Sequence, residues 1–243
     1  GIAHVVGSSK GTNYDRIPTL DATPSGSAYL HYTSNNTIFG TQFSGVPSSD
    51  VPLIADMSSD IFSRTFNPEA FHMIYAGAQK NMGPAGTVMY AFDRDAVGKT
   101  GRSIPSYLDL AVHASKDSMF NTPPVFPIYV SMLTMRWMHA LGGVEAMEAR
   151  NQRKSNLIYQ EIDRNALFEG HATMDSRSNM NATFRLKDDA LGTAFDALWK
   201  EAGINGLKGH RSVGGYRASM YNALSESSVQ VLVDVMKELE RRH

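Results

Sequence analysis

The 243-residue sequence contains no cysteine and no long uninterrupted apolar stretch. Without cysteine there can be no disulfide framework, no thiolate nucleophile and no cysteine-based metal site. No apolar segment is long enough to span a bilayer, and the first residues lack the charged-then-apolar order of a signal peptide. These absences favour a cytoplasmic protein without a membrane partner.

The chain also has little excess charge, because 23 Lys and Arg oppose 24 Asp and Glu for a formal net charge of −1. Nucleic-acid binding normally needs a basic excess, so no nucleic-acid partner is expected. Small anions remain open as ligands, since a few local arginines can bind them. The histidines show no metal-ligand spacing, so no metal site is predicted.

What the sequence does contain is a series of short apolar runs, each followed by polar residues. They cover residues 29–32, 51–55, 72–76 and 87–92, and an earlier run over residues 1–6 is also strand-like. Nearly continuous apolar runs are typical of strands covered on both faces in an α/β sheet. Ligands of such sheets gather beyond the carboxyl ends of the strands. The residues that follow these runs, and are therefore candidates, are Thr37, Asp56 and Lys80.

The second half of the chain mixes helical patterns with short strands. Thr122 is predicted to cap a helix that ends at Gly142-Gly143. Further elements are expected as helices over 144–162 and 190–202, strands over 181–186 and 216–221, and a terminal helix with Val229, Leu232, Val233, Met236 and Leu239 on its core face. We expect residues 1–141 to form part of a large domain with a mostly parallel sheet, and residues 142–243 to form a smaller α/β domain.

Lys80 is the best candidate for a catalytic amine, because it lies between an apolar run and the glycine-rich residues 83–86, far in sequence from other charges. Burial would lower the pKa of its ammonium and favour Schiff-base formation. Such a lysine needs an electron sink, commonly pyridoxal phosphate, whose ring nitrogen a carboxylate such as Asp56 can keep protonated. The structural alternatives are a lysine that closes a strand-to-turn junction and a solvated or helix-capping aspartate.

Donors for a cofactor phosphate are present in Gln79, Thr37, Asn121 and Thr122. A helix cap at Thr122 is compatible with phosphate binding, because helix N-termini attract anions.

Residues 208–219 place His210, Arg211 and Arg217 among glycines. Guanidinium groups bind carboxylates and phosphates bidentately, so this stretch is predicted to bind an anionic substrate. A surface loop with incidental basic residues is the alternative.

Four ordered blocks resemble the phosphoserine aminotransferases of the class-V family; they are residues 55–59, 76–86, 121–124 and 208–219. The resemblance runs from about Tyr29 to the C-terminus. It implies a pyridoxal-phosphate enzyme of the aspartate-aminotransferase fold type (fold type I) that acts as a homodimer with shared active sites. It also implies amino transfer between L-glutamate and 3-phosphohydroxypyruvate in serine biosynthesis, giving O-phospho-L-serine and 2-oxoglutarate.

The resemblance also implies roles for individual residues. Lys80 would form the Schiff base and shuttle the substrate proton, Asp56 would pair with the pyridine nitrogen, and Arg217 would bind the substrate α-carboxylate. The remaining implied contacts are cofactor binding by Thr37 and Gln79, binding of the neighbouring subunit's cofactor phosphate by Asn121 and Thr122, and binding of the substrate phosphate by His210 and Arg211.

Members of this family carry about a further third of a chain before the point where this sequence begins, so a clipped or partly recorded chain is expected. Two alternatives therefore stay open at the level of sequence. One is an inactive form that only dimerises or binds cofactor weakly. The other is a related pyridoxal-phosphate aminotransferase that uses another acid.

Overall fold

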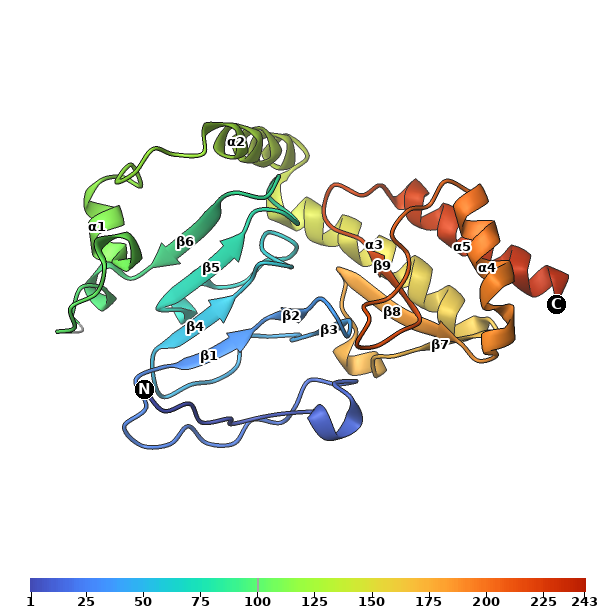
Figure 1. Cartoon of the computed structure of the whole chain (residues 1–243), viewed down its shortest axis with the longest axis horizontal. Helices are drawn as coiled ribbons and strands as arrows, with labels where there is room; N and C mark the ends of the chain where they lie inside the picture. Colours follow the sequence, from blue (N-terminus) through green and yellow to red (C-terminus); the bar gives the residue numbers. More distant parts are fainter. Residues whose placement is uncertain (100) are drawn as a thin grey trace.

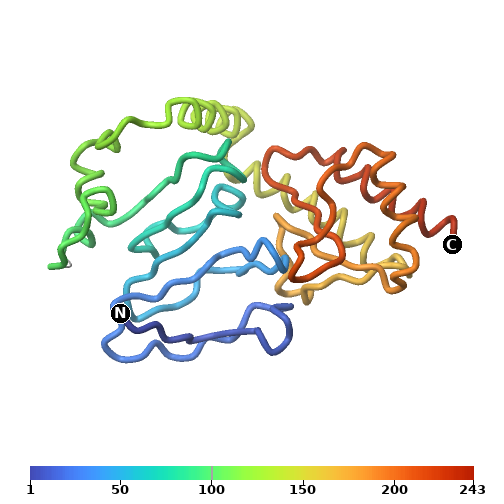
Figure 2. The backbone as a smooth tube through the Cα atoms, in the orientation of Figure 1, coloured from blue at the N-terminus to red at the C-terminus, as the bar shows by residue number. Residues whose placement is uncertain are grey.

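A computed structural model describes residues 1–99 and 101–243. Figure 1 shows two groups of strands and helices side by side, the first made by the N-terminal part (residues 1–142) and the second by the C-terminal part (residues 143–243). The tube in Figure 2 shows the N-terminal residues running along the lower edge of the molecule toward the C-terminal part. A domain boundary near residue 142 stays a prediction.

The N-terminal part contains a four-stranded sheet in the order β1-β4-β5-β6. Its strands are β1 (Leu30–Thr33), β4 (Leu53–Asp56), β5 (Met73–Gly77) and β6 (Val88–Phe92). The first three are parallel, and β6 pairs antiparallel with β5. The expected α/β fold with a mostly parallel sheet is thus confirmed, and the strand ends that carry Asp56 and lead to Lys80 are neighbours.

Only one face of this sheet is fully covered by the described residues. Leu30 and Tyr32 are buried whereas His31 and Thr33 of the same strand are exposed, and β6 is mostly exposed. The covered face packs on residues 57–71, which supply further buried apolar side chains. Alternate side chains of a strand point to opposite faces of the sheet, and in β1 only those of one face are buried. The expectation that these strands are covered on both faces is therefore wrong for the described chain.

The apolar run at the start of the chain does not form a strand. Ile2 and Val5 are 86% and 80% exposed, and Val6 accepts a hydrogen bond from the backbone N–H of Asp21 outside any ladder. The strand-like pattern was misleading here, because a strand needs a partner for its backbone groups. The short elements of this part are η1 (Lys10–Thr12), β2 (Asn35–Asn36), β3 (Thr41–Gln42), η2 (Pro68–Ala70), η3 (Arg94–Ala96), η4 (Ser106–Leu108) and α1 (Leu110–Ser115).

Helix α2 (Val125–Ala140) begins later than the sequence predicts. Its N-cap is Pro124, with φ −75° and ψ 81°, and no side chain of the described residues caps it. The predicted cap at Thr122 is therefore wrong, because two consecutive prolines hold the entering backbone out of the helical region. The predicted stop at the glycine pair is confirmed to within two residues, since Gly142 lies at φ 103° between α2 and α3.

The C-terminal part packs helices on one antiparallel sheet of order β7-β8-β9. Its elements are α3 (Gly143–Arg164), β7 (Phe168–Gly170), η5 (Met174–Ser176), β8 (Asn181–Leu186), η6 (Asp189–Leu191), α4 (Gly192–Glu201), β9 (Tyr216–Ser219) and α5 (Glu226–Arg242). All five predicted core residues of the terminal helix are buried. Among the described residues, no helix is long and apolar enough to cross a membrane.

Candidate active site

The structure brings Lys80 and Thr37 into direct contact at one end of the parallel strands. Lys80 lies in the turn after β5, and Thr37 follows the β2 strand that continues from β1. The Lys80 Nζ donates a hydrogen bond of 2.8 Å to the Thr37 hydroxyl. Two residues that are 43 positions apart therefore meet where the sheet rule predicts a ligand site.

The amine of Lys80 is half-buried, and burial is the main cause that lowers its pKa below the ordinary value. The positive charge of Arg217 acts in the same direction, whereas Asp56 and Asp60 act against it. A lowered pKa leaves more of the free amine, the form that attacks carbonyl carbons, at neutral pH. Lys80 is thus suited to act as a nucleophile.

Asp56 is the last residue of β4, and the residues that follow the strand hold its carboxylate in place. Its Oδ1 accepts a hydrogen bond of 2.8 Å from the backbone N–H of Ser58, whose hydroxyl in turn accepts one of 3.0 Å from Gly77. Across the ladder Asp56 lies opposite Tyr75. The carboxylate is therefore fixed on the partly open face of the sheet, close enough to Lys80 to act on its charge.

Tyr75 and His31 extend this open face, and sequence reasoning did not single them out as a pair. The Tyr75 hydroxyl lies 2.9 Å from the His31 Nε2, and the two rings stack with centroids 5.9 Å apart. Burial, followed by the nearby Asp56, raises the pKa of Tyr75. A signal was available in the alternation of polar and apolar residues along β1, although only the register shows which side chains meet.

Arg217 reaches this site from the C-terminal part. It lies on β9, and its Nη1 donates a hydrogen bond of 3.3 Å to the backbone oxygen of Thr37. Its Nε is buried and has no hydrogen-bond partner among the described residues. Such an unpaired guanidinium N–H indicates capacity to bind an anion beside Lys80.

The other residues predicted for the site do not join this contact group in the described structure. Gln79 is exposed, and its Oε1 lies 2.6 Å from where a Cβ on Gly77 would be, so the glycine leaves room for that side chain. Asn121 and Thr122 are exposed ahead of α2, and the Asn121 amide donates 3.2 Å to the Thr122 carbonyl.

His210 and Arg211 lie in the loop that precedes β9. The Nδ1 of His210 accepts a hydrogen bond of 3.2 Å from the backbone N–H of Ser212, and Arg211 is exposed. They share the loop with Gly214 and Gly215, both at positive φ, which let it turn tightly. The loop thus presents Arg211 to solvent, with His210 partly buried beside it.

The residues that are brought together fit pyridoxal phosphate. Lys80 offers an amine of lowered pKa for the aldehyde, and Asp56 offers a carboxylate for a protonated ring nitrogen. Thr37 offers a hydroxyl for the phosphate, and Gln79, which lies outside this contact group, offers an amide from the adjacent turn. The unpaired Nε of Arg217 leaves a cationic group for a substrate carboxylate. An amine, an anion for the ring and a cation for the substrate are what amino transfer requires.

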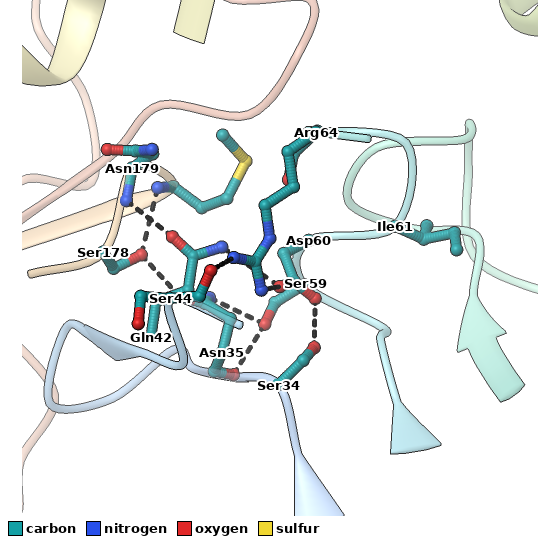
Figure 3. A network of polar contacts seen from close by, with 12 residues as sticks. Ser34, Asn35, Gln42, Ser44, Ser59, Asp60, Ile61, Arg64, Ser178 and Asn179 are labelled. Carbon is teal, nitrogen blue, oxygen red and sulfur yellow. Dashed lines mark hydrogen bonds and ion pairs between the residues drawn. The ribbon is translucent and has the colours of Figure 1, made fainter. Parts of the chain in front are cut away.

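A buried polar network holds the two parts together next to this site (Figure 3). The amide of Asn35 donates to Ser59 and to Asn181 at 2.8 and 2.9 Å, and Gln42 joins Asp60 to the backbone N–H of Asn179 with two bonds of 3.0 Å. Asp60 also accepts a hydrogen bond from the hydroxyl of Ser34. Since these groups are buried, their bonds fix how the C-terminal part lies against the strand ends.

Comparison with known proteins agrees with this geometry. The sequence profile of class-V aminotransferases matches residues 6–232. Phosphoserine aminotransferase from Flavobacterium psychrophilum is 58% identical over 238 residues, which cover 98% of this chain and 67% of that protein. The corresponding protein from Flavobacterium johnsoniae is 57% identical with the same coverage. The chain thus spans about two thirds of the length of these relatives.

Solved structures give the same result. Phosphoserine aminotransferase from Bacillus circulans subsp. alkalophilus matches with a TM-score of 0.96 and 42% identity, over 100% of this chain and 68% of that one. A phosphoserine aminotransferase structure whose Schiff base was studied for radiation damage matches with a TM-score of 0.94 and 43% identity, over 99% of this chain and 68% of that one. By sequence and by structure, the chain belongs to the phosphoserine aminotransferases of the class-V aminotransferase family.

Proposed function

We propose that this chain transfers the amino group of L-glutamate to 3-phosphohydroxypyruvate, giving 2-oxoglutarate and O-phospho-L-serine, with pyridoxal phosphate as cofactor. The observation that supports this best is the half-buried amine of Lys80, hydrogen-bonded to Thr37 and subject to the charges of Asp56 and Arg217. The names of the relatives supply phosphoserine as the amino acid, and L-glutamate is what the family resemblance implies, because the geometry alone does not distinguish these from other amino and keto acids.

Pyridoxal phosphate, when bound, supplies an aldehyde that takes up the amino group and a ring that accepts an electron pair. Lys80 would hold that aldehyde, and its Nζ would carry the proton of the substrate α-carbon. The lowered pKa of Lys80 suits both tasks, because the amine must lose and regain a proton near neutral pH. Thr37 orients the amine with its hydroxyl.

The charged residues around Lys80 divide the remaining tasks. Asp56 stabilises a protonated ring nitrogen, and its bond from Ser58 keeps the carboxylate aimed along the open face. Arg217 binds the α-carboxylate that both amino-acid substrates share. Gln79 binds the cofactor phosphate, while His210 and Arg211 bind the substrate phosphate from their exposed loop.

We further propose that the working form is a homodimer in which Asn121 and Thr122 bind the cofactor phosphate of the second subunit. These residues lead into α2, where Val125, Phe126 and Tyr129 are 69%, 70% and 54% exposed. Exposed apolar side chains gathered on one helix turn favour burial against a partner surface. The cytoplasmic setting stays a prediction.

The deciding experiment is an absorbance titration of the purified 243-residue chain with pyridoxal phosphate. We expect the yellow band of lysine-bound cofactor in the wild type and its loss in Lys80→Ala, with Lys99→Ala as a matched lysine control. A wild type that stays colourless would refute cofactor binding by this chain and leave the inactive alternative. A band without transfer to 3-phosphohydroxypyruvate, but with transfer to another keto acid, would point to a different acid substrate.

A further inference from the structure

We propose that Asn222 is a positioning residue, which sets the distance between the amine turn at Lys80 and the carboxylate-binding residue Arg217. This inference rests on the proposed roles of Lys80 and Arg217. Asn222 touches neither of them. It acts through a chain of hydrogen bonds from the C-terminal part to the residue that follows Lys80 in the sequence.

The direct link is between Asn222 and Asn81. The backbone N–H of Asn222 donates a hydrogen bond of 3.0 Å to the Oδ1 of Asn81, across a separation of 141 residues. Asn81 is 3% exposed, and its amide also donates to the carbonyl of Ile61 at 2.9 Å. The side chain of Asn81 thereby fixes the backbone one bond away from Lys80.

The side chain of Asn222 adds two further anchors and has no exposed surface. Its amide donates a hydrogen bond of 3.0 Å to the carbonyl of Phe62, and its Oδ1 accepts a hydrogen bond of 2.8 Å from the amide of Asn151 on α3. Asn151 also donates 3.0 Å to the carbonyl of Ser63. Asn222 is therefore held from both parts of the molecule at once, and buried amides left without partners cost free energy.

The backbone between Arg217 and Asn222 is fixed in turn. Met220 donates 2.7 Å from its N–H to the carbonyl of Met180. The fully buried Lys154 donates 2.9 Å to each of the carbonyls of Met220 and Tyr221. Because the backbone of residues 217–222 is held by these hydrogen bonds, a change in the position of Asn222 is passed on to Arg217.

The two ends of this path meet again at Thr37. Lys80 bonds to the hydroxyl of Thr37, and Arg217 bonds to its backbone oxygen. The path through Asn81 and Asn222 thus closes a loop of contacts behind the site. A loosened Asn222 would let the C-terminal part shift, so that Arg217 moves away from Lys80 and water reaches the amine.

That shift has a measurable consequence for Lys80. Burial and the charge of Arg217 both lower the pKa of Lys80, whereas Asp56 and Asp60 raise it from their positions in the N-terminal part. Loosening the junction weakens the two lowering effects together. A residue that only stabilised the fold would leave the pKa of Lys80 unchanged in the molecules that remain folded.

The experiment measures the rate of reductive methylation of Lys80 against pH in the cofactor-free chain, peptide by peptide with mass spectrometry. For Asn222→Ala and for Asn151→Ala we expect the pKa of Lys80 to rise, so that labelling at pH 8 slows about threefold. The double variant should slow no further than Asn222→Ala, because both substitutions break one path.

Val233→Ala is the matched control, because Val233 is 1% exposed in the C-terminal core and its truncation lowers stability without touching the path. Unchanged labelling of Lys80 in Asn222→Ala and Asn151→Ala, with a melting point lowered as in the control, would overturn the proposal. Where Asn222→Ala does not fold, Asn151→Ser supplies the same comparison with a smaller change. The readout needs no cofactor, so it separates this inference from failure of the proposed function.

Discussion

Lys80 and Thr37, which lie 43 residues apart, are joined by a hydrogen bond of 2.8 Å from the amine to the hydroxyl. The same threonine offers its backbone oxygen to Arg217 at 3.3 Å. One residue therefore holds both the amine of the N-terminal part and the guanidinium of the C-terminal part. Lys80 bonds to the hydroxyl of Thr37 and Arg217 to its backbone oxygen, so a side-chain substitution can remove the first contact and keep the second.

Replacing Thr37 with valine removes the acceptor and keeps the side-chain volume. Because a hydrogen bond to an ammonium stabilises its charged form, we expect the pKa of Lys80 to fall further in Thr37→Val. Thr37→Ser keeps the hydroxyl, so Lys80 should have the same pKa in this variant as in the wild type. The measurement is the pH dependence of Lys80 labelling, and equal curves for the valine and serine variants would show that the bond contributes nothing.

Arg211 and Arg217 should differ in which half of the reaction they serve. Arg211→Ala is expected to raise KM for 3-phosphohydroxypyruvate about ten- to a hundredfold while L-glutamate is used normally, since a charge-assisted hydrogen bond contributes roughly 1.5 to 3 kcal/mol. Arg217→Ala should raise KM for both substrates, because each carries an α-carboxylate. Steady-state kinetics with each substrate varied tests this, and a loss shared equally by both substrates in Arg211→Ala would refute the assignment of Arg211.

Lys154 should make the stability of the chain depend on pH. Burial, with Arg150 nearby, lowers the pKa of Lys154 from 10.5 to about 8. Between these two values the unfolded chain binds more protons than the folded one, so the contribution of Lys154 to the unfolding free energy rises with pH. The rise is at most about 1.4 kcal/mol per pH unit.

Urea unfolding of the wild type and Lys154→Met at pH 7.5 and 9.5 isolates this effect. The free-energy difference between them should shift in favour of the wild type at the higher pH. A difference that does not change between the two pH values would argue against a lowered pKa for Lys154.

Gly40 should resist substitution more strongly than a glycine of similar conformation elsewhere. It lies at φ 73°, and a Cβ there would be 2.6 Å from the backbone oxygen of Asn181 in the other part. Gly26 has φ 79° and nothing within 4 Å of a Cβ. Both alanine variants carry the cost of positive φ, about 1 to 2 kcal/mol. Gly40→Ala should lower the free energy of unfolding more than Gly26→Ala does, as measured by thermal or urea unfolding. Equal losses of stability would show that the backbone near Asn181 moves aside at little cost.

The sequence predicts the parallel strands and their shared edge well, because each strand is a mainly apolar run with polar residues at its end or in the turn that follows. Asp56 and Lys80 could be placed from this pattern alone. The run over residues 1–6 has the same appearance and fails, since nothing in its own sequence tells whether a neighbouring strand will pair with it. β7 was missed because three residues, one of them Glu169, are too short a pattern to recognise.

The contacts that join the two parts could not be predicted. Asn81, Asn151 and Asn222 are ordinary polar residues in sequence, 70 and 71 positions apart, and asparagine is usually exposed. Their burial becomes understandable only when three remote segments meet and satisfy one another's amides. Thr122 shows the opposite error, because the two prolines that follow it are compatible with a first helical turn in sequence, whereas the helix begins only after them.

The junction between the two parts also determines how ionic strength should affect this protein. The pairs Asn35–Asn181 and Asn81–Asn222 join the two parts through neutral groups, and Asp60, the carboxyl group of the junction, is buried away from dissolved ions. The anions proposed to bind at Arg217 and Arg211 must instead approach through solvent, where their attraction is screened. Added salt should therefore weaken substrate capture while the two parts keep their alignment.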